Sequence, residues 1–191
     1  LFLLSTGDEK YMPAIKRFVK SRQFNDQSYP WHMGMGGLGL CEYYLRTGDK
    51  SVLPTLQAGA DQLKRLMYAG GWSGRGHAQF TYSVGSGQLN AAAVPAATYL
   101  LLAKLCGVNV DEYTLQESLK NFYRYAGHDN VGYGNNWPEG GFRDNGKTSA
   151  LAFTMQAAAR LDPAGEQSVY ARARDISSTK AFYANSWFNR G

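Results

Sequence analysis

Residues 47–56 read TGDKSVLPTL, and a related stretch at residues 6–15 reads TGDEKYMPAI. Glycine commonly ends helices and aspartate commonly caps their starts, so each stretch predicts the end of one helix and the start of the next. The proline in each stretch falls in an early helical turn, where its missing N–H group costs least. The same helix–turn–helix junction therefore occurs twice, at an offset of 41 residues.

Two kinds of helix alternate on either side of these junctions. One kind is nearly uncharged and should be buried on most sides, whereas the other carries an apolar stripe opposite a charged face. The uncharged kind is predicted at residues 33–46, 90–105 and 147–160. The amphipathic kind is predicted at residues 51–68, 110–125 and 166–177.

A second repeat supports this alternation, because residues 87–91 (GQLNA) and 146–150 (GKTSA) open two of the uncharged helices alike. Self-similarity at about 40 to 60 residues with two helices per unit indicates a helical-hairpin array, in which the apolar helices form an inner layer. We therefore predict an all-α fold, a two-layer α/α toroid, of which this chain supplies a partial toroid of about three hairpins. An α-solenoid meets the same description.

The connection at residues 127–146 reads GHDNVGYGNNWPEGGFRDNG and is too long and too aromatic to be an idle connector. Loops beyond about 12 to 15 residues are usually functional or disordered, and aromatic residues argue against disorder. A shorter relative at residues 70–86 joins the preceding pair of helices. Both turns run from an amphipathic helix to an apolar one, which places them at one mouth of a toroid.

A single domain, residues 1–191, is expected from the length and from a hydrophobic content of 44%. Because the chain starts at Leu1 rather than at a methionine, we interpret it as an internal piece of a longer protein. The apolar run at residues 1–4 is far shorter than the roughly 20 residues that span a bilayer, so no transmembrane segment is predicted. The net charge of +5 is spread along the chain, so no nucleic-acid partner is expected.

Several reaction classes known from α/α toroids do not fit the residues. Zinc-dependent prenyl transfer needs an Asp, Cys and His ligand set, but Cys41 and Cys106 each lie in an apolar helical run without paired ligands. The Asp-rich motif of alkene-protonating cyclases and a nucleophile elbow are absent as well. We therefore expect no metal and no cofactor. Two cysteines alone do not decide whether a disulfide forms.

Carbohydrate chemistry fits the long turns better. Glycosidases use two carboxylates roughly 5 to 9.5 Å apart, and Glu139 with Asp144 can supply such a pair. Polysaccharide lyases use a Tyr or His base beside groups that neutralise a uronate. Matching candidates are the bases Tyr133, His77 and His128 and the neutralising residues Arg75, Asn135 and Asn136. The alternative is structural, with Asp144 capping the next helix, Glu139 solvated and the histidines hydrogen-bonded within their loops.

The aromatic residues of the turns allow two roles. Rings beside glycine can present flat apolar faces to sugars, and Trp72 and Trp137 are the predicted ligand contacts, with Tyr133 and Phe142 beside them. The same rings can equally plug the gap between neighbouring hairpins. His32, which follows Trp31, is expected to pack in the core.

Five stretches carry a resemblance to a known family: residues 28–32 (SYPWH), 42–54 (EYYLRTGDKSVLP), 89–92 (LNAA), 131–134 (VGYG) and 144–147 (DNGK). Through them almost the whole chain resembles a bacterial domain of unknown function with an α/α-toroid fold, similar in architecture to terpenoid cyclases and protein prenyltransferases. The resemblance implies a toroid that continues on both sides of this chain. It also implies an exported protein with a PDZ-like domain, in the periplasm, the cell envelope or outside the cell, but it implies no activity.

From these residues we expect binding or processing of a polysaccharide at the mouth formed by the inner helices. The alternative is a non-catalytic scaffold or interaction domain in an extracellular or cell-envelope assembly. The expected partners are accordingly a glycan or other protein chains. Because about three hairpins leave apolar inner helices uncovered, the remainder of the toroid or a partner is expected to cover them.

Overall fold

A computed structural model describes residues 1–74, 88–125, 131–134, 147–162 and 168–177 of the chain. Within these ranges the regular elements are helices, and the β-type pairings are two isolated bridges, Tyr68 with Gly71 and Leu89 with Gly134. The all-α class predicted from the sequence is therefore confirmed.

The described part of the chain forms α1 (Phe2–Ser5), α2 (Met12–Ser21), α3 (Pro30–Thr47), α4 (Leu53–Leu66), α5 (Asn90–Leu105), α6 (Glu112–Tyr123), α7 (Lys147–Ala159) and α8 (Ser168–Ser177). Short 3-10 turns at Glu9–Tyr11 and Lys50–Val52 lead into α2 and α4. The predicted uncharged helices correspond to α3, α5 and α7, and the predicted amphipathic helices correspond to α4, α6 and α8. None of the described helices is both long and apolar enough to cross a membrane.

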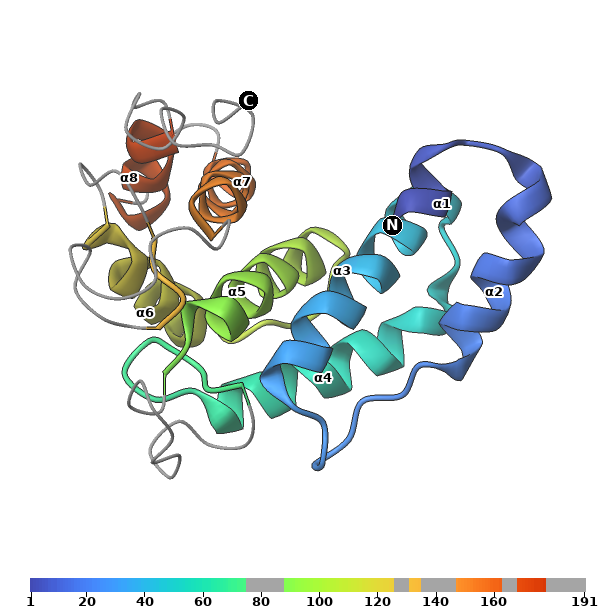
Figure 1. Ribbon diagram of the computed structural model, residues 1–191, viewed down its shortest axis with the longest axis horizontal. Coiled ribbons are helices and arrows are strands. Elements are labelled where there is room, and N and C mark those ends of the chain that lie inside the picture. The colour runs from blue at the N-terminus through green and yellow to red at the C-terminus, as the bar shows by residue number, and fades with distance from the viewer. Residues whose placement is uncertain (75–87, 126–130, 135–146, 163–167, 178–191) are drawn as a thin grey trace.

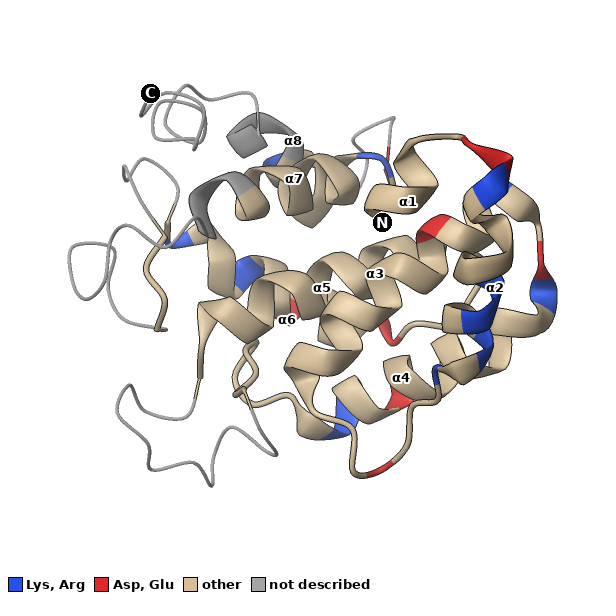
Figure 2. Ribbon diagram, turned by 45° about the vertical axis from the view of Figure 1, so that its right-hand side comes forward, with Lys and Arg blue, Asp and Glu red and all other residues tan. Residues whose placement is uncertain are grey.

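The helices pack in an order that follows the chain (Figure 1). Helix α5 lies between α3 and α7, and it contacts both of them along its length. Helix α4 packs against α3 and α5, whereas α6 packs against α5 and α8, and α8 packs against α7. Charged residues are plentiful on α2, whereas α5 has Lys104 as its one charged residue (Figure 2). The uncharged helices therefore form the packed centre.

The repeated Thr-Gly-Asp junction has the same geometry in both copies. Its glycine adopts a left-handed conformation, with φ of +66° at Gly7 and +68° at Gly48, where a side chain would be strained. In each copy the threonine hydroxyl accepts the aspartate N–H group at 3.2 Å. The aspartate carboxylate then accepts the N–H group two residues later at 3.0 Å, and so caps the next helical segment. The junction motif is therefore a turn with its own hydrogen bonds.

Helices α3 and α5 approach closely because glycines of α3 face α5. A Cβ atom added at Gly34 would lie 2.7 Å from the backbone nitrogen of Ala96, and one added at Gly37 would lie 2.4 Å from the ring of Tyr99. Successive contacts advance in the same direction along both helices, so α3 and α5 run parallel. Their starts therefore lie at the same end of the packed centre.

Gly34→Ala should lower the free energy of unfolding by about 2–4 kcal/mol, because the added methyl group meets backbone atoms of α5 that cannot move aside. Gly39→Ala is the matched control on the same helix, since no atom lies within 4 Å of the position of its Cβ. The control should be neutral or stabilising by up to about 1 kcal/mol, as expected for alanine in a helix. Chemical denaturation measures both changes, and equal losses in the two variants would contradict the close contact.

The start of α6 is fixed by Asp111, which also joins α6 to α4. The Asp111 carboxylate accepts the N–H group of Thr114 at 2.9 Å and forms an ion pair with the Lys64 ammonium at 2.7 Å. The hydrogen bonds from Lys64 and Thr114 lower the pKa of Asp111 to about 2. The carboxylate therefore remains ionised in the folded protein at acidities that protonate it in the unfolded chain.

This difference predicts an acid-sensitive contribution to stability. Because the pKa is lower in the folded state, the ionised carboxylate stabilises the fold above about pH 4, and the contribution is lost as the pH falls toward the folded pKa of about 2. Asp111→Asn retains a capping oxygen but removes the charge. Between pH 4 and pH 2 the Tm of the wild type should therefore fall more steeply than that of the variant. Parallel Tm curves would show that Asp111 makes no such contribution.

Candidate functional site

The starts of α3 and α5 lie at one end of the packed centre, together with the segments that lead into the two long turns. We call this end the rim. It consists of residues 29–32, 68–74, 88–91 and 131–134. The polar groups of the described rim are amides, hydroxyls, an imidazole and two indoles, and these residues include no carboxylate. The described rim therefore offers hydrogen-bonding and aromatic groups, but acid–base chemistry with a carboxylate would need groups from elsewhere.

Both long turns are attached to the rim by main-chain hydrogen bonds at the start of α5. The N–H group of Leu89 donates to the carbonyl of Trp72 at 2.8 Å, which fixes the segment before the first turn. The N–H group of Ala91 donates to the carbonyl of Tyr133 at 3.2 Å, which fixes the segment of the second turn. The two turns, far apart in sequence, are therefore attached to neighbouring residues.

The side chain of Asn90, the first residue of α5, strengthens the second attachment. Its Nδ2 group donates to the carbonyls of Gly132 and Gly134 at 3.0 and 2.7 Å, and lies 2.8 Å from the Tyr125 hydroxyl. Asn90 is fully buried, and it supplies a donor to the buried carbonyl of Gly132 and to the half-buried carbonyl of Gly134. Its Oδ1 atom has no partner among the described residues. An asparagine is needed here as a donor to the turn.

The sequence left two roles open for Trp72, contact with a ligand or packing, and in this structure the residue packs. Its side chain is fully buried, and the indole N–H group donates to the carbonyl of Leu63 near the end of α4 at 2.8 Å. The predicted contact between Trp72 and a ligand is therefore corrected, because neither face of the ring is accessible. Gln88 joins the same structure by donating to the carbonyl of Tyr68.

Tyr133 is the other predicted site residue that the structure describes. Its backbone is fixed at the rim by the hydrogen bond from Ala91, and its side chain is half-buried. The remaining predicted site residues lie outside the described residues: Arg75, His77, His128, Asn135, Asn136, Trp137, Glu139 and Asp144, together with Phe142.

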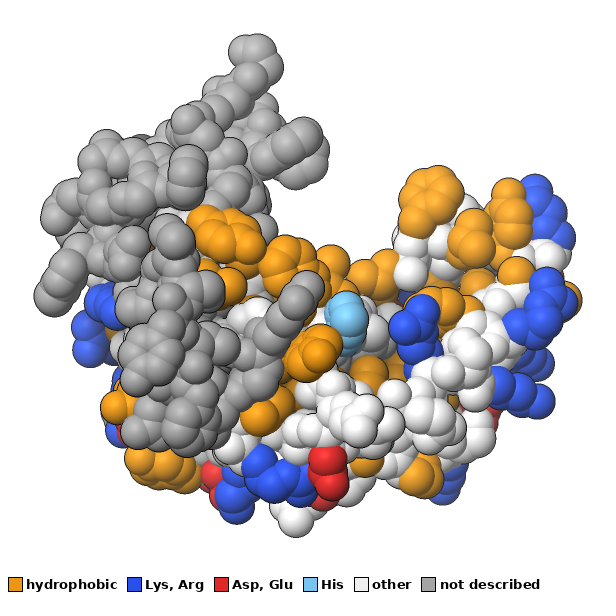
Figure 3. Space-filling model, turned by 60° about the horizontal axis from the view of Figure 1, so that its bottom comes forward, with side chains coloured by type: hydrophobic (Ala, Val, Ile, Leu, Met, Phe, Trp, Pro, Cys, Tyr) orange, Lys and Arg blue, Asp and Glu red, His pale blue; other side chains and the backbone are white. Residues whose placement is uncertain are grey.

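The start of α3 supplies an aromatic group that the sequence reasoning missed. Tyr29 and Trp31 are 41% and 39% exposed, and His32 is exposed with its ring centroid 5.7 Å from that of Tyr29. Figure 3 shows a histidine at the surface beside hydrophobic side chains. The expectation that His32 packs is wrong, because Trp31 and His32 lie on the side of α3 away from the buried Pro30 and Met33. Trp31 and His32 directly follow Pro30, which marks a helix start, and this position was the sequence signal for the exposed group.

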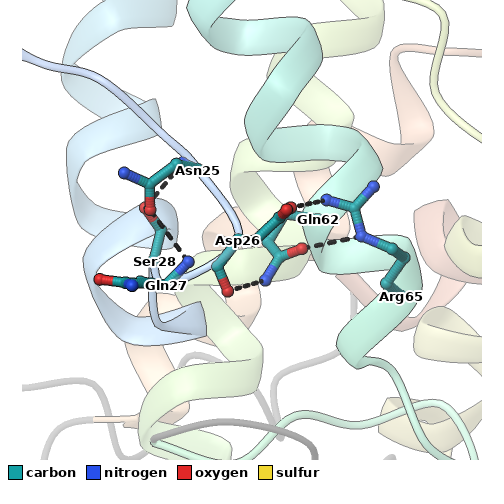
Figure 4. A network of polar contacts seen from close by, with 6 residues as sticks. All are labelled: Asn25, Asp26, Gln27, Ser28, Gln62 and Arg65. Atoms are coloured by element: carbon teal, nitrogen blue, oxygen red, sulfur yellow. Dashed lines mark hydrogen bonds and ion pairs between the residues drawn. The ribbon is translucent and has the colours of Figure 1, made fainter.

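The position of this aromatic group is set by a polar network that joins the preceding turn to α4 (Figure 4). The Gln62 amide donates to the carbonyl of Asp26 at 2.9 Å, and Arg65 donates to the Asp26 carboxylate at 2.6 Å. Arg65 also donates to the Gln62 side-chain oxygen at 2.9 Å. Asn25 and Ser28 close the turn, since the Asn25 N–H group donates to the Ser28 hydroxyl at 3.0 Å. The entry into α3 is therefore tied to its neighbouring helix.

Metal chemistry has no site among the described residues, which contain no group of three or more His, Cys, Asp or Glu side chains that could hold an ion. Cys41 and Cys106 are both free thiols and are both buried. The rim therefore combines an exposed aromatic surface with half-buried polar groups, and buried hydrogen bonds hold its segments together.

Asn90→Ala should lower the free energy of unfolding by about 2–4 kcal/mol, because it removes the side-chain donor to the buried carbonyl of Gly132 and to the half-buried carbonyl of Gly134. It should also speed hydrogen exchange of the Ala91 amide, which is bonded to the same turn. Asn109→Ala, at an exposed asparagine, is the control and should change stability by less than about 0.5 kcal/mol. Unchanged Ala91 exchange in the Asn90 variant would show that the side chain does not hold the turn.

Comparison with known proteins gives one family. No curated protein and no solved structure matched the chain. The family described as Domain of unknown function (DUF6288) matches residues 1–191, which is the whole sequence. The chain therefore belongs to the DUF6288 family.

Proposed function

We propose that this domain binds a polysaccharide at the rim, and that residues of the two long turns process it. The observation that carries the proposal is the exposed group of Tyr29, Trp31 and His32 at the start of α3. Indole and phenol rings stack on the apolar faces of sugars, while imidazole and amide groups hydrogen-bond to the hydroxyls. Three such residues within one helical turn present both kinds of contact together.

The catalytic part of the proposal rests on residues that follow the fixed segments in the sequence. Asn135 directly follows Gly134, and Arg75 directly follows Gly74. Of the candidate carboxylates, Glu139 would act with Asp144 on a glycosidic bond. In a lyase, Tyr133, His77 or His128 would act as the base instead, with Arg75, Asn135 and Asn136 neutralising a uronate. Trp137 would add a second ring for stacking.

The same proposal includes the larger architecture. Parallel packing of α3 and α5, with α4 connecting them along one side, is the arrangement expected for an arc of an α/α toroid. A toroid places the starts of its inner helices around one mouth, so the rim would be part of that mouth. The rest of the toroid or a partner chain would cover the inner helices, in an exported protein of the periplasm, the cell envelope or the extracellular space.

A non-catalytic scaffold is the second candidate, and the burial of Trp72 favours it. A fully buried ring that is hydrogen-bonded to α4 contributes stability and leaves less surface for a ligand. In that case the exposed apolar residues of α3, Trp31 and Met35, would contact another protein chain.

Binding can be tested by co-sedimentation with peptidoglycan sacculi and with insoluble polyuronate. If the proposal holds, wild-type protein co-sediments with one of these, and Trp31→Ala weakens binding at least about tenfold by removing the stacking ring. Tyr113→Ala is the matched control, because Tyr113 is 67% exposed on α6, whose start lies beside the end of α5, away from the rim. Binding that is equally weakened by both variants, or absent from the wild type, would contradict the proposal.

Processing is measured separately, as soluble sugar released from the glycan that binds. Glu139→Ala should abolish release while leaving binding within about twofold, since a catalytic carboxylate acts mainly on the transition state. Tyr133→Phe separates the two mechanisms, because loss of release would identify Tyr133 as a lyase base. The scaffold alternative predicts that neither substitution changes any activity or affinity.

A further inference from the structure

The two thiols of the chain meet at the contact between α3 and the end of α5. Cys41 lies in the second half of α3, and Cys106 directly follows the last residue of α5. The Cys106 Sγ atom donates to the Cys41 carbonyl at 3.8 Å, and the two side chains also contact each other. Cys41 is fully buried and Cys106 is 4% exposed. Neither residue has a part in the rim.

The two helices meet at this point, since the Cys106 Sγ atom lies 3.8 Å from the Cys41 carbonyl oxygen. A disulfide requires Cα atoms within about 7 Å, a separation that ordinary helix pairs at 8–10 Å between axes reach only where their facing residues are small. Gly34 and Gly37 provide such a contact, because an added Cβ at either position would overlap atoms of α5. The parallel contact continues beyond Gly37 and Tyr99 to Cys41, whose carbonyl meets the Cys106 thiol about three residues further along the chain than the register of the glycines gives.

We propose that Cys41 and Cys106 are a disulfide-forming pair, and that an external disulfide such as oxidised glutathione closes them into a bond that joins α3 to the end of α5. In the first step the Cys106 thiolate attacks one sulfur of oxidised glutathione, forms a mixed disulfide and releases one glutathione thiolate. In the second step Cys41 loses its proton and attacks the Cys106 sulfur, which releases the second glutathione. The protein loses two hydrogens, and one glutathione disulfide is reduced to two thiols.

The surroundings of the two sulfurs give this order of attack. The contact with Cys106 and burial together raise the pKa of the Cys41 thiol far above its usual value, so Cys41 is the poorer first nucleophile. Cys106 lies between Leu105 and Gly107, both exposed, and is the thiol nearer to solvent. Once Cys106 carries glutathione, the neighbouring Cys41 is the nearest thiol that can displace it.

The bond would have a defined effect on stability. It closes a loop of about 65 residues that contains α4 and the first long turn, and such cross-links restrict the unfolded chain. If the bond forms in the native packing, the Tm of the oxidised protein should exceed that of the reduced protein by about 5–10 °C. In a reducing compartment the pair would remain as two thiols, whereas in an oxidising compartment it would be closed.

The test starts with the reduced wild-type chain, unfolded and refolded in a glutathione redox buffer and quenched with acid. Intact mass and thiol titration under denaturing conditions then show the state of both sulfurs. The expected result is a mass lower by two hydrogen atoms, no free thiol and no bound glutathione. Wild-type protein that keeps both thiols, or that carries glutathione on either cysteine at equilibrium, would overturn the proposal.

Two variants and a melting curve show whether the bond belongs to the native fold. Cys41→Ala lacks the displacing thiol, so it should retain glutathione on Cys106, and Cys106→Ala should show no loss of hydrogen. The wild type should show a Tm that rises on oxidation and returns on treatment with dithiothreitol. A Tm that is unchanged or lower after oxidation would overturn the assignment of the bond to the native contact between α3 and α5.

Discussion

The contact between α3 and α5 sets the geometry on which the rest of the described structure depends. Side chains normally keep helix axes 8–10 Å apart. At Gly34 and Gly37 the side chain is absent where α3 packs against α5, so the two helices can approach more closely. The register of this contact makes the two helices parallel and brings their starts to one end. Two aromatic residues at the start of α3 and Asn90 at the start of α5 lie at the same end of the packed centre for that reason. A bulkier residue at either glycine would shift the helices, and the rim would change with them.

The rim is built where amphipathic helices end and uncharged helices begin, and that position explains its many polar contacts. The last carbonyls of a helix and the first N–H groups of the next lack partners within their own helices. At the end of α4 the Trp72 indole donates to the carbonyl of Leu63, which also accepts the N–H group of Met67, and near the start of α5 the carbonyl of Tyr133 accepts the N–H group of Ala91. The segments that form hydrogen bonds with these backbone groups at the helix ends are held in place by those hydrogen bonds. The attachment of both long turns therefore follows from completing the hydrogen bonds of helix ends.

Much of the fold was predictable because it is encoded locally. The Thr-Gly-Asp junction is recognisable since each of its residues has a conformational or capping role, and both copies adopt one geometry. The lack of charge in residues 90–105 predicted α5 with the observed bounds, Asn90–Leu105. The parallel contact of α3 with α5 was not predictable in the same way, because four glycines read as a weak helix until their packing partner is known. Residues 135–146 and the other candidates outside the described ranges stay predictions.

Site residues are harder to assign because residue type does not distinguish packing from ligand contact. Trp72 and Trp31 are both tryptophans near the rim, yet Trp72 is fully buried and Trp31 is 39% exposed. The difference comes from what each indole N–H group can reach. Trp72 follows the end of α4, where the carbonyl of Leu63 accepts its hydrogen bond. Trp31 lies in the first turn of α3, where the backbone groups without partners are N–H donors, which cannot accept a hydrogen bond from an indole.

That asymmetry gives a general criterion for aromatic residues at such a rim. A tryptophan just after an amphipathic helix such as α4 meets carbonyl acceptors and can be buried at low cost, because its one polar group is satisfied. In the first turn of an uncharged helix such as α3, the free backbone groups that a tryptophan meets are donors, so burial there would leave its N–H group unpaired. By this criterion position relative to the helix ends, rather than aromatic content, identifies the rings that are available to a ligand. By the same criterion, Trp31 and Tyr29 rather than Trp72 are the aromatic residues of the proposed site.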